Sequence, residues 1–222
     1  PRKTELAKYA NYHLQLRPGT NVALLNMMLY YIIKENVADQ DFIAARTEGY
    51  DEFKESILNL NIDELENITG VDRNLVRDAA MAYAVAPNAM SFHGLGVTEH
   101  SQGTYTVMLI ADLAMITGNI GRRGVGVNPL RGQNNVQGAA DMGCQPYQGA
   151  GYLDVTNPEI HKMYEEFYHA KLPLHVGLKI PQMYDAALNS TLKAIWVIGE
   201  DMAQTDPNTH HVLKALDKLD LF

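Results

Sequence analysis

The sequence has a single cysteine among its 222 residues, Cys144, and this scarcity excludes several kinds of site. One cysteine cannot form an internal disulfide, and it cannot supply an all-cysteine metal or iron–sulfur site by itself. Cysteine usage therefore leaves the cellular compartment open. We expect the cytoplasm, with the periplasm as the alternative.

The chain also lacks a long apolar run and an excess of positive charge. Its longest helical candidate is interrupted by Asn26, Lys34 and Glu35, so no segment is long enough to span a bilayer, and no signal peptide opens the chain. The formal net charge is −8 and the pI is near 5.4. A basic face is what nucleic acids and anionic membranes require, so we expect neither a nucleic-acid partner nor a membrane segment.

The chain does contain a polar, glycine-interrupted stretch at residues 126–143, which reads GVNPLRGQNNVQGAADMG. The glycines let the backbone approach a bound group closely. The guanidinium of Arg131 is a planar fork of donors that matches a carboxylate or a phosphate, and the neighbouring amides can donate and accept at the rim of a heterocycle. A solvated polar loop is the alternative, and composition alone favours it.

Apolar spacing and capping residues predict the secondary structure. We expect helices at residues 21–37, 40–45, 51–58, 72–86, 101–117, 158–171, 181–189 and 207–216, with a further turn that starts at Asn61. We expect strands at residues 89–92, 192–198 and 219–222, the first of them short and buried, and a polar loop at residues 145–157. The run at 192–198 is nearly continuous in apolar residues, as in a strand buried on both faces. This alternation predicts an α/β fold with a doubly wound sheet, in which ligands bind at the carboxyl ends of strands.

Two loops follow predicted strands and are candidate binding sites. Gly94 and Gly96 come directly after the strand at 89–92, in an arrangement that can place backbone amides against a phosphate or a polar ring, although a lone Gly-x-Gly is weak evidence. Asp201 follows the strand at 192–198, where its carboxylate can accept from guanine or ribose, with Thr205 assisting. Capping of the following helix by Asp201 is the equally weighted alternative.

The other residues that could act in catalysis or metal binding do not form a recognisable motif. No histidine pair has a strong ligand spacing, so we interpret most of the eight histidines as surface or satisfied interior residues. Glu99 and Asp141 are acid/base candidates, but isolated carboxylates more often serve as hydrogen-bonding or capping groups. A Gly-x-Ser-x-Gly elbow of the serine hydrolases is not present.

The stretch from Leu130 to Gly143, with its Arg-Gly-Gln-Asn-Asn-Val-Gln-Gly run, resembles the catalytic (alpha) subunit of molybdopterin-dependent formate dehydrogenases. These belong to the dimethyl sulfoxide reductase superfamily of molybdopterin oxidoreductases. The likeness continues through residues 94–100, 113–121 and 197–201 and covers essentially the whole chain. It implies portions of two doubly wound (Rossmann-like) α/β domains, with residues 1–132 in one cofactor-binding domain and residues 133–222 in a second.

The resemblance implies that the chain is a central fragment of an enzyme that oxidises formate to carbon dioxide. The reaction centre would be molybdenum or tungsten held by bis(molybdopterin guanine dinucleotide). The family's metal-ligating cysteine or selenocysteine and the cysteines for its 4Fe-4S cluster have no counterpart here, so we expect this chain to be inactive alone. The implied partners are formate, the remainder of the catalytic subunit and electron-transfer subunits. Another molybdopterin oxidoreductase, such as a nitrate reductase, and a non-catalytic α/β binding module are the alternatives.

The resemblance also assigns roles to particular residues. Arg131 matches the arginine that faces the metal and holds the formate carboxylate, and Gln133 matches a cofactor contact beside the active centre. The loop that touches a pterin is matched by Gly94, Leu95, Gly96 and Glu99, and the loop against guanosine by Gly199, Glu200, Asp201 and Thr205. Glu99 stands where some members carry Gln, so an acceptor replaces a group that can also donate. Cys144 falls outside the metal-ligand position, and no metal ligand is expected in this chain.

Overall fold

The computed structural model describes residues 2–222, which divide into two compact units. The first unit ends at Asn134 and the second begins at Asn135. The sequence places the boundary between residues 132 and 133, within the same loop. The assignment of the two parts to separate cofactor-binding domains stays a prediction.

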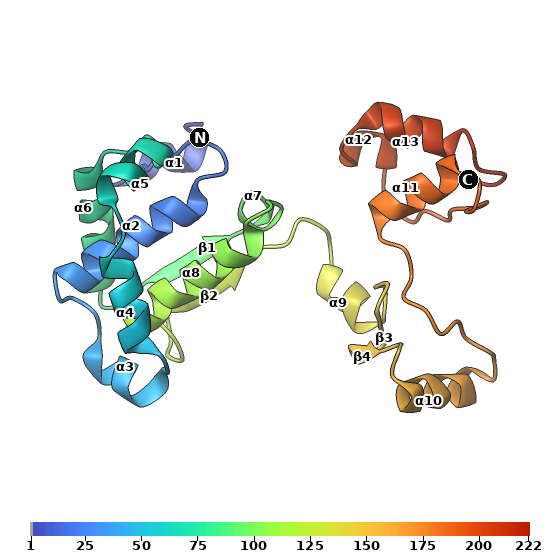
Figure 1. Ribbon diagram of the computed structural model, residues 1–222, viewed down its shortest axis with the longest axis horizontal. Helices are drawn as coiled ribbons and strands as arrows, with labels where there is room; N and C mark the ends of the chain where they lie inside the picture. The colour runs from blue at the N-terminus through green and yellow to red at the C-terminus, as the bar shows by residue number, and fades with distance from the viewer. Residues whose placement is uncertain (1) are drawn as a thin grey trace. The chain divides into compact units, whose positions relative to one another are not determined.

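The first unit is mostly helical and contains one small parallel sheet (Figure 1). Its helices are α1 (Glu5–Tyr9), α2 (Asn21–Lys34), α3 (Gln40–Arg46), α4 (Tyr50–Leu58), α5 (Ile62–Thr69), α6 (Arg73–Val85), α7 (Leu95–Thr98) and α8 (Gly103–Ile116). Its strands are β1 (Met90–His93) and β2 (Gly126–Pro129). The helices predicted from apolar spacing in this unit are confirmed, with ends that differ by a few residues.

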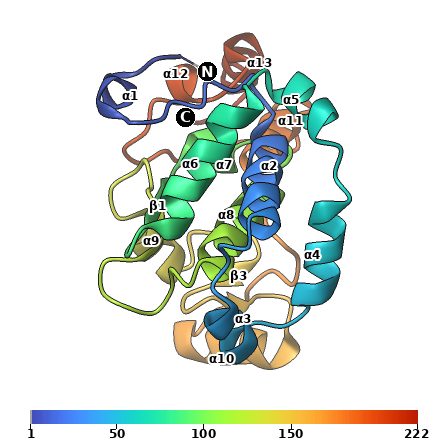
Figure 2. The same ribbon diagram turned by 90° about the vertical axis from the view of Figure 1, so that its left-hand side faces the viewer.

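Helix α2 is the centre of the first unit and packs against α4, α5, α6 and α8 (Figures 1 and 2). Met27, Leu29 and Ile32 point in different directions around this helix and are all completely buried, because neighbouring helices cover α2 on several sides. The helix ends at Lys34 rather than near residue 37, since Asn36 has a left-handed φ of 56°. Burial of α2 builds the core on which the sheet and its loops rest.

The sheet pairs β1 with β2 in parallel, with Met90 opposite Gly126 and His93 opposite Pro129. Helix α8 lies in the crossover between the two strands and packs against both. We expected β1 to be buried, and this is wrong for two of its residues, since Met90 is 45% and Phe92 is 61% exposed. Side chains alternate along a strand, so these two share the face that α8 does not cover.

The second unit has shorter elements. They are α9 (Val136–Asp141), β3 (Gln148–Gly149), β4 (Leu153–Asp154), α10 (Pro158–Tyr168), α11 (Ile180–Leu188), α12 (Met202–Thr205) and α13 (Thr209–Leu216). The pair β3 and β4 is antiparallel and lies where the sequence predicts only a polar loop. A small core forms between α11 and α13, from Tyr184, Ala187, Val212 and Ala215.

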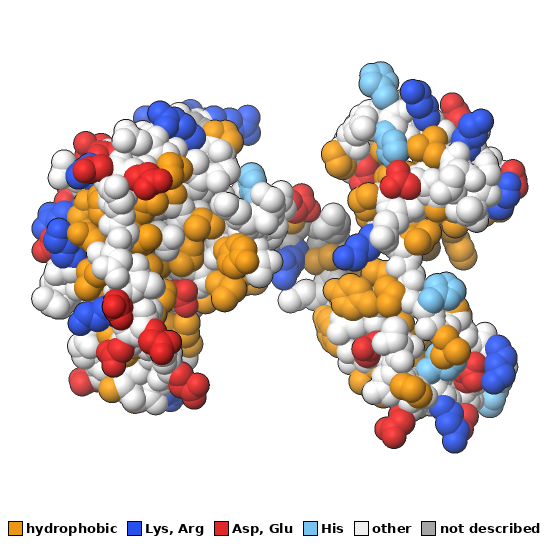
Figure 3. All heavy atoms as spheres, in the orientation of Figure 1, with side chains coloured by type: hydrophobic (Ala, Val, Ile, Leu, Met, Phe, Trp, Pro, Cys, Tyr) orange, Lys and Arg blue, Asp and Glu red, His pale blue; other side chains and the backbone are white. Residues whose placement is uncertain are grey.

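The strand predicted at residues 192–198 is not formed as expected. This segment makes one parallel bridge, between Ala194 and Leu221, and its other residues carry no ladder. Trp196 is 89% and Ile198 is 80% exposed, and hydrophobic side chains lie at the surface of this unit (Figure 3). A strand requires a hydrogen-bonded neighbour along its length. Within residues 2–222 this segment pairs with another segment only through the bridge from Ala194 to Leu221, so no regular strand forms.

The chain is nevertheless of the α/β class. Both parallel pairings in the described residues, β1 with β2 and Ala194 with Leu221, join segments separated by helices. This connection is the building block of doubly wound folds. No helix in residues 2–222 is long and apolar enough to cross a membrane.

Candidate functional site

The carboxyl ends of β1 and β2 meet at one edge of the sheet and bring two predicted loops together. The N–H of Leu130 donates to the carbonyl oxygen of His93 at 2.6 Å. A Cβ added to Gly94 would lie 3.3 Å from the carbonyl oxygen of Leu130, and one added to Gly132 would lie 3.2 Å from Cδ1 of Leu95. The loop at residues 94–96 therefore lies beside the loop that carries Arg131.

The glycine loop leads into α7, a single turn that the sequence analysis did not predict. Gly94 caps it, and its carbonyl oxygen accepts from the N–H groups of Val97 at 3.0 Å and Thr98 at 3.2 Å. A Cβ at Gly96 would meet nothing within 4 Å, so the backbone there is open to a bound group. Glu99 ends the turn with an exposed side chain.

Helix α8, predicted to begin at residue 101 after the glycine loop, is separated from that loop by α7. Its first residue is Gly103, and a Cβ there would lie 2.1 Å from the carbonyl oxygen of Thr98. The start of α8 is thus covered by α7. Backbone amides that face a ligand at this edge must come from residues 94–96 rather than from the N-terminus of α8, since the N–H groups of Val97 and Thr98 already donate to Gly94.

Arg131 and Gln133 are exposed in the loop after β2. No carboxylate pairs with Arg131 and no hydrogen bond engages its guanidinium within residues 2–222. Arg122 differs, because it donates to the carbonyl oxygen of Pro87 at 3.1 Å and to side-chain oxygens of Asn88 and Asn119. Arg122 therefore has a structural role, while the donors of Arg131 are available to an anion.

His93 is a residue of this edge that the sequence analysis missed. We interpreted most histidines as surface or satisfied interior residues, and His93 is an exception. Its side chain is 7% exposed, and Nδ1 is buried without a hydrogen-bond partner. A buried polar atom without a partner destabilises the folded protein. Such an atom is expected beside a ligand that can bond to it rather than in the hydrophobic core. The available signal was its position as the last strand residue before Gly94.

The second predicted loop, at residues 199–205, is one compact turn in the second unit. Gly199 has a left-handed φ of 70°. The hydroxyl of Thr205 donates to Oε1 of Glu200 at 3.0 Å and lies equally close to the carbonyl oxygen of Asp201. All the residues assigned to this loop are exposed and lie within one turn of the chain.

Asp201 does not cap the helix that follows it. It stands at the N-cap position of α12, but its side chain accepts no bond from the helix backbone. Instead Oδ2 accepts from Nε2 of Gln204 at 2.7 Å, which orients the carboxylate. The capping interpretation is therefore wrong, and the carboxylate retains acceptor capacity for a ligand.

Tyr184 and Asp206 next to this turn were also missed. The Tyr184 hydroxyl donates to Oδ2 of Asp206, although the two residues lie 22 positions apart. Burial, and then the hydrogen bond to Asp206, raises the pKa of Tyr184. A tyrosine and an aspartate so far apart in sequence show no pattern that links them.

Within residues 2–222 no group of three or more His, Cys, Asp or Glu can hold a metal ion.

Comparison with known proteins gives a consistent result. A family model described as "Molybdopterin oxidoreductase" matches residues 1–222. The chain is 44% identical over 220 residues to the F420-dependent formate dehydrogenase subunit alpha of Methanocaldococcus jannaschii, covering 99% of this chain and 32% of that protein. It is 42% identical over 222 residues to formate dehydrogenase H of Escherichia coli, covering 100% of this chain and 31% of that protein.

The chain thus spans about a third of the length of the curated relatives that it matches. Among solved structures, acetylene hydratase from Pelobacter acetylenicus aligns with a TM-score of 0.67 over 99% of this chain and 33% of that chain, at 19% identity. A likeness at this identity concerns the fold alone.

Proposed function

Because the chain belongs to the molybdopterin oxidoreductase family, we propose that it forms part of the catalytic subunit of an enzyme that oxidises formate to carbon dioxide. The names of the relatives that are 42% and 44% identical support this substrate. The observation that carries the proposal is the unpaired guanidinium of Arg131 beside the open backbone of residues 94–96.

Arg131 is well suited to a small carboxylate. Formate offers two oxygens and one hydrogen, so a planar guanidinium can bind both oxygens and fix the direction of the C–H bond. A substrate with so few atoms gains most of its orientation from one such contact. Gln133, two residues further, adds an amide that can donate or accept at the same edge.

The residues present fit a pterin and a nucleotide. The open Gly96 and the buried, unpartnered Nδ1 of His93 favour a polar ring close to the loop after β1, with Gly94, Leu95 and Glu99 as further contacts. Gly199, Glu200, Asp201 and Thr205 form a turn whose carboxylates can accept from guanine or ribose. The bound metal–pterin group supplies the two-electron chemistry, and the protein positions the substrate.

The finer assignments belong to the same proposal. The cofactor is molybdopterin guanine dinucleotide with molybdenum or tungsten, and a 4Fe-4S cluster is ligated outside these residues. The remainder of the catalytic subunit and electron-transfer subunits complete the enzyme, which we place in the cytoplasm or the periplasm. This chain alone would then be inactive.

Replacement of Arg131 by Lys in the full-length protein tests the proposal. A lysine keeps the charge but loses the two-pronged contact, so we expect kcat/KM for formate to fall about a hundredfold. Reduction of a viologen dye by formate measures it. The matched control is Arg123→Lys, at an exposed arginine in the same unit, which should retain wild-type turnover. Unchanged turnover in Arg131→Lys would show that Arg131 does not hold the substrate.

A further inference from the structure

We propose that Tyr184 and Asp206 form a positioning pair that fixes the turn at residues 199–206, an inference that rests on the proposed binding of a guanine dinucleotide there. The turn carries Asp201 and Thr205, and its one regular element is the four-residue helix α12. Met202 packs against the small core between α11 and α13, while most of the other side chains of the turn are exposed. A segment with so little buried surface opens easily unless other contacts hold it.

The hydrogen bonds within the turn shape it without attaching it to the rest of the unit. Gln204 donates to Asp201 at 2.7 Å, and Thr205 donates to Glu200 at 3.0 Å. These bonds join residues at most five positions apart and are exposed. Each competes with water, so its net contribution is small.

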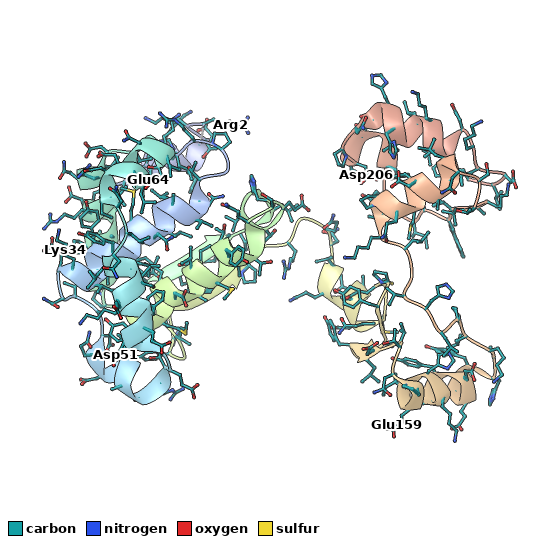
Figure 4. The ribbon with its side chains drawn as sticks, in the orientation of Figure 1. Arg2, Lys34, Asp51, Glu64, Glu159 and Asp206 are labelled. Carbon is teal, nitrogen blue, oxygen red and sulfur yellow. The ribbon has the colours of Figure 1, made fainter. Side chains whose placement is uncertain are left out.

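Tyr184 supplies the attachment from a different part of the chain. It lies on α11, is 3% exposed, and donates its hydroxyl to Asp206, the residue directly after Thr205. Asp206 lies next to α11 and α12 (Figure 4). Because the acceptor is a carboxylate, the bond is stronger than one between neutral groups.

The tyrosine ring is itself held in place. It belongs to the core between α11 and α13 and stands edge-on to the ring of His211, with centroids 6.4 Å apart. Nε2 of His211 lies 3.2 Å from Oδ1 of Asp185. The turn is therefore tied to the buried core of the second unit, and the pair acts on the nucleotide through Asp201 and Thr205.

The hydroxyl remains a donor over the ordinary pH range. Burial and the neighbouring Asp206 carboxylate both raise the pKa of Tyr184, because each disfavours the phenolate. The link between α11 and the turn therefore does not depend on ionisation of the tyrosine near neutral pH.

The test is Tyr184→Phe in the full-length protein, which removes the hydroxyl and keeps the ring. The measured quantity is GMP released by hydrolysis from the protein-bound cofactor, followed over time after dilution and gel filtration. We expect Tyr184→Phe to lose bound GMP about fivefold faster than the wild type. The matched control is Tyr164→Phe, which removes another tyrosine hydroxyl, bonded to the carbonyl oxygen of Ala150 at 2.7 Å, and should lose GMP at the wild-type rate.

A second set of variants separates positioning from general stability. Asp206→Asn keeps an oxygen that can accept from the hydroxyl but loses the charge, so it should lose GMP at a rate between those of the wild type and Asp206→Ala. Asp206→Ala should lose GMP at least as fast as Tyr184→Phe. The double variant should lose it no faster than Asp206→Ala, since the interaction is already absent.

Two outcomes would overturn the inference, and they are distinguishable. Equal GMP retention in Tyr184→Phe and Tyr164→Phe would show that the pair does not position the turn, and would leave the proposed function standing. A wild-type protein that releases no GMP would instead contradict the guanine dinucleotide itself, and the positioning role with it.

Discussion

At the scale of single residues, the charge of Glu66 joins two helices of the first unit. Its carboxylate accepts from the backbone N–H of Arg73 at 2.9 Å and from Nε of the same residue at 2.6 Å, while Arg73 also donates to Asp63. The hydrogen bonds from Arg73 lower the pKa of Glu66. One carboxylate thereby connects the end of α5 to the start of α6.

Replacement of Glu66 by Gln should make the free energy of unfolding less dependent on pH. A carboxyl whose folded pKa is lowered stabilises the protein above its unfolded pKa, about 4.3, and loses this contribution as the pH falls through the folded value. The wild type should therefore exceed Glu66→Gln in stability at pH 7, and the difference should vanish in acid. Urea unfolding from pH 3 to pH 7 measures it. Glu55→Gln, at an exposed glutamate of α4 without a bonded partner, is the control, and an equal pH effect there would contradict the role of Glu66.

At the scale of elements, α8 is followed by Gly118, where both the backbone conformation and a close neighbour require glycine. Gly118 has a left-handed φ of 64°, a conformation that glycine commonly adopts where a helix ends. A Cβ there would lie 2.3 Å from Oδ2 of Asp39. The side chain of Asp39 caps α3 by accepting from the N–H of Phe42 at 2.9 Å, and its own N–H donates to the carbonyl oxygen of Ile116 at 2.8 Å. The end of α8 and the start of α3 are therefore built together.

Gly118→Ala should lower the free energy of unfolding more than Gly121→Ala does. Gly121 has a similar φ of 81°, but a Cβ there would meet nothing within 4 Å, so its substitution measures backbone strain alone, about 1 kcal/mol. At Gly118 the added methyl also displaces Asp39 from its capping position, which costs about 1 kcal/mol more. Urea unfolding of the two variants measures the difference. Equal losses would show that the contact with Asp39 is unimportant.

Helices of this chain could be predicted from sequence because their signals are local. The spacing of Leu29, Ile32 and Ile33 and the capping oxygen of Asp72 act within a few residues, and both occur in the structure. The strand at 192–198 could not be predicted in the same way. Its apolar run indicates burial, but a strand forms only where another segment supplies the hydrogen bonds. The sequence of residues 192–198 does not indicate which segment that is.

At the scale of the whole molecule, the candidate site was predictable in part. The sequence placed Gly94 directly after a predicted strand and singled out Arg131 in a polar stretch, but it did not predict strand β2, which precedes Arg131. The pairing of β1 with β2 brings the two loops together at one edge of the sheet. His93 and the pair of Tyr184 and Asp206 could not be found, because an unpartnered nitrogen or a bond over 22 positions appears only after folding.

The two units differ in how much apolar surface each buries in its own core. The core of the first unit extends from Leu24 to Ile116 and includes several large, fully buried side chains, such as Met27 and Ile32. The core of the second unit consists of Tyr184, Ala187, Val212 and Ala215. Because apolar burial is the main stabilising contribution, the second unit should open at lower free energy than the first.

Val212→Ala should therefore act on the second unit alone. Val212 is completely buried, and its truncation should cost about 1 to 3 kcal/mol of opening free energy. Hydrogen exchange read by mass spectrometry should show faster exchange in α11 and α13 and unchanged exchange in α2. Leu213→Ala, at the next residue, which is 45% exposed, is the matched control and should have a smaller effect. Acceleration in α2 equal to that in α13 would mean that the two cores unfold as one cooperative unit.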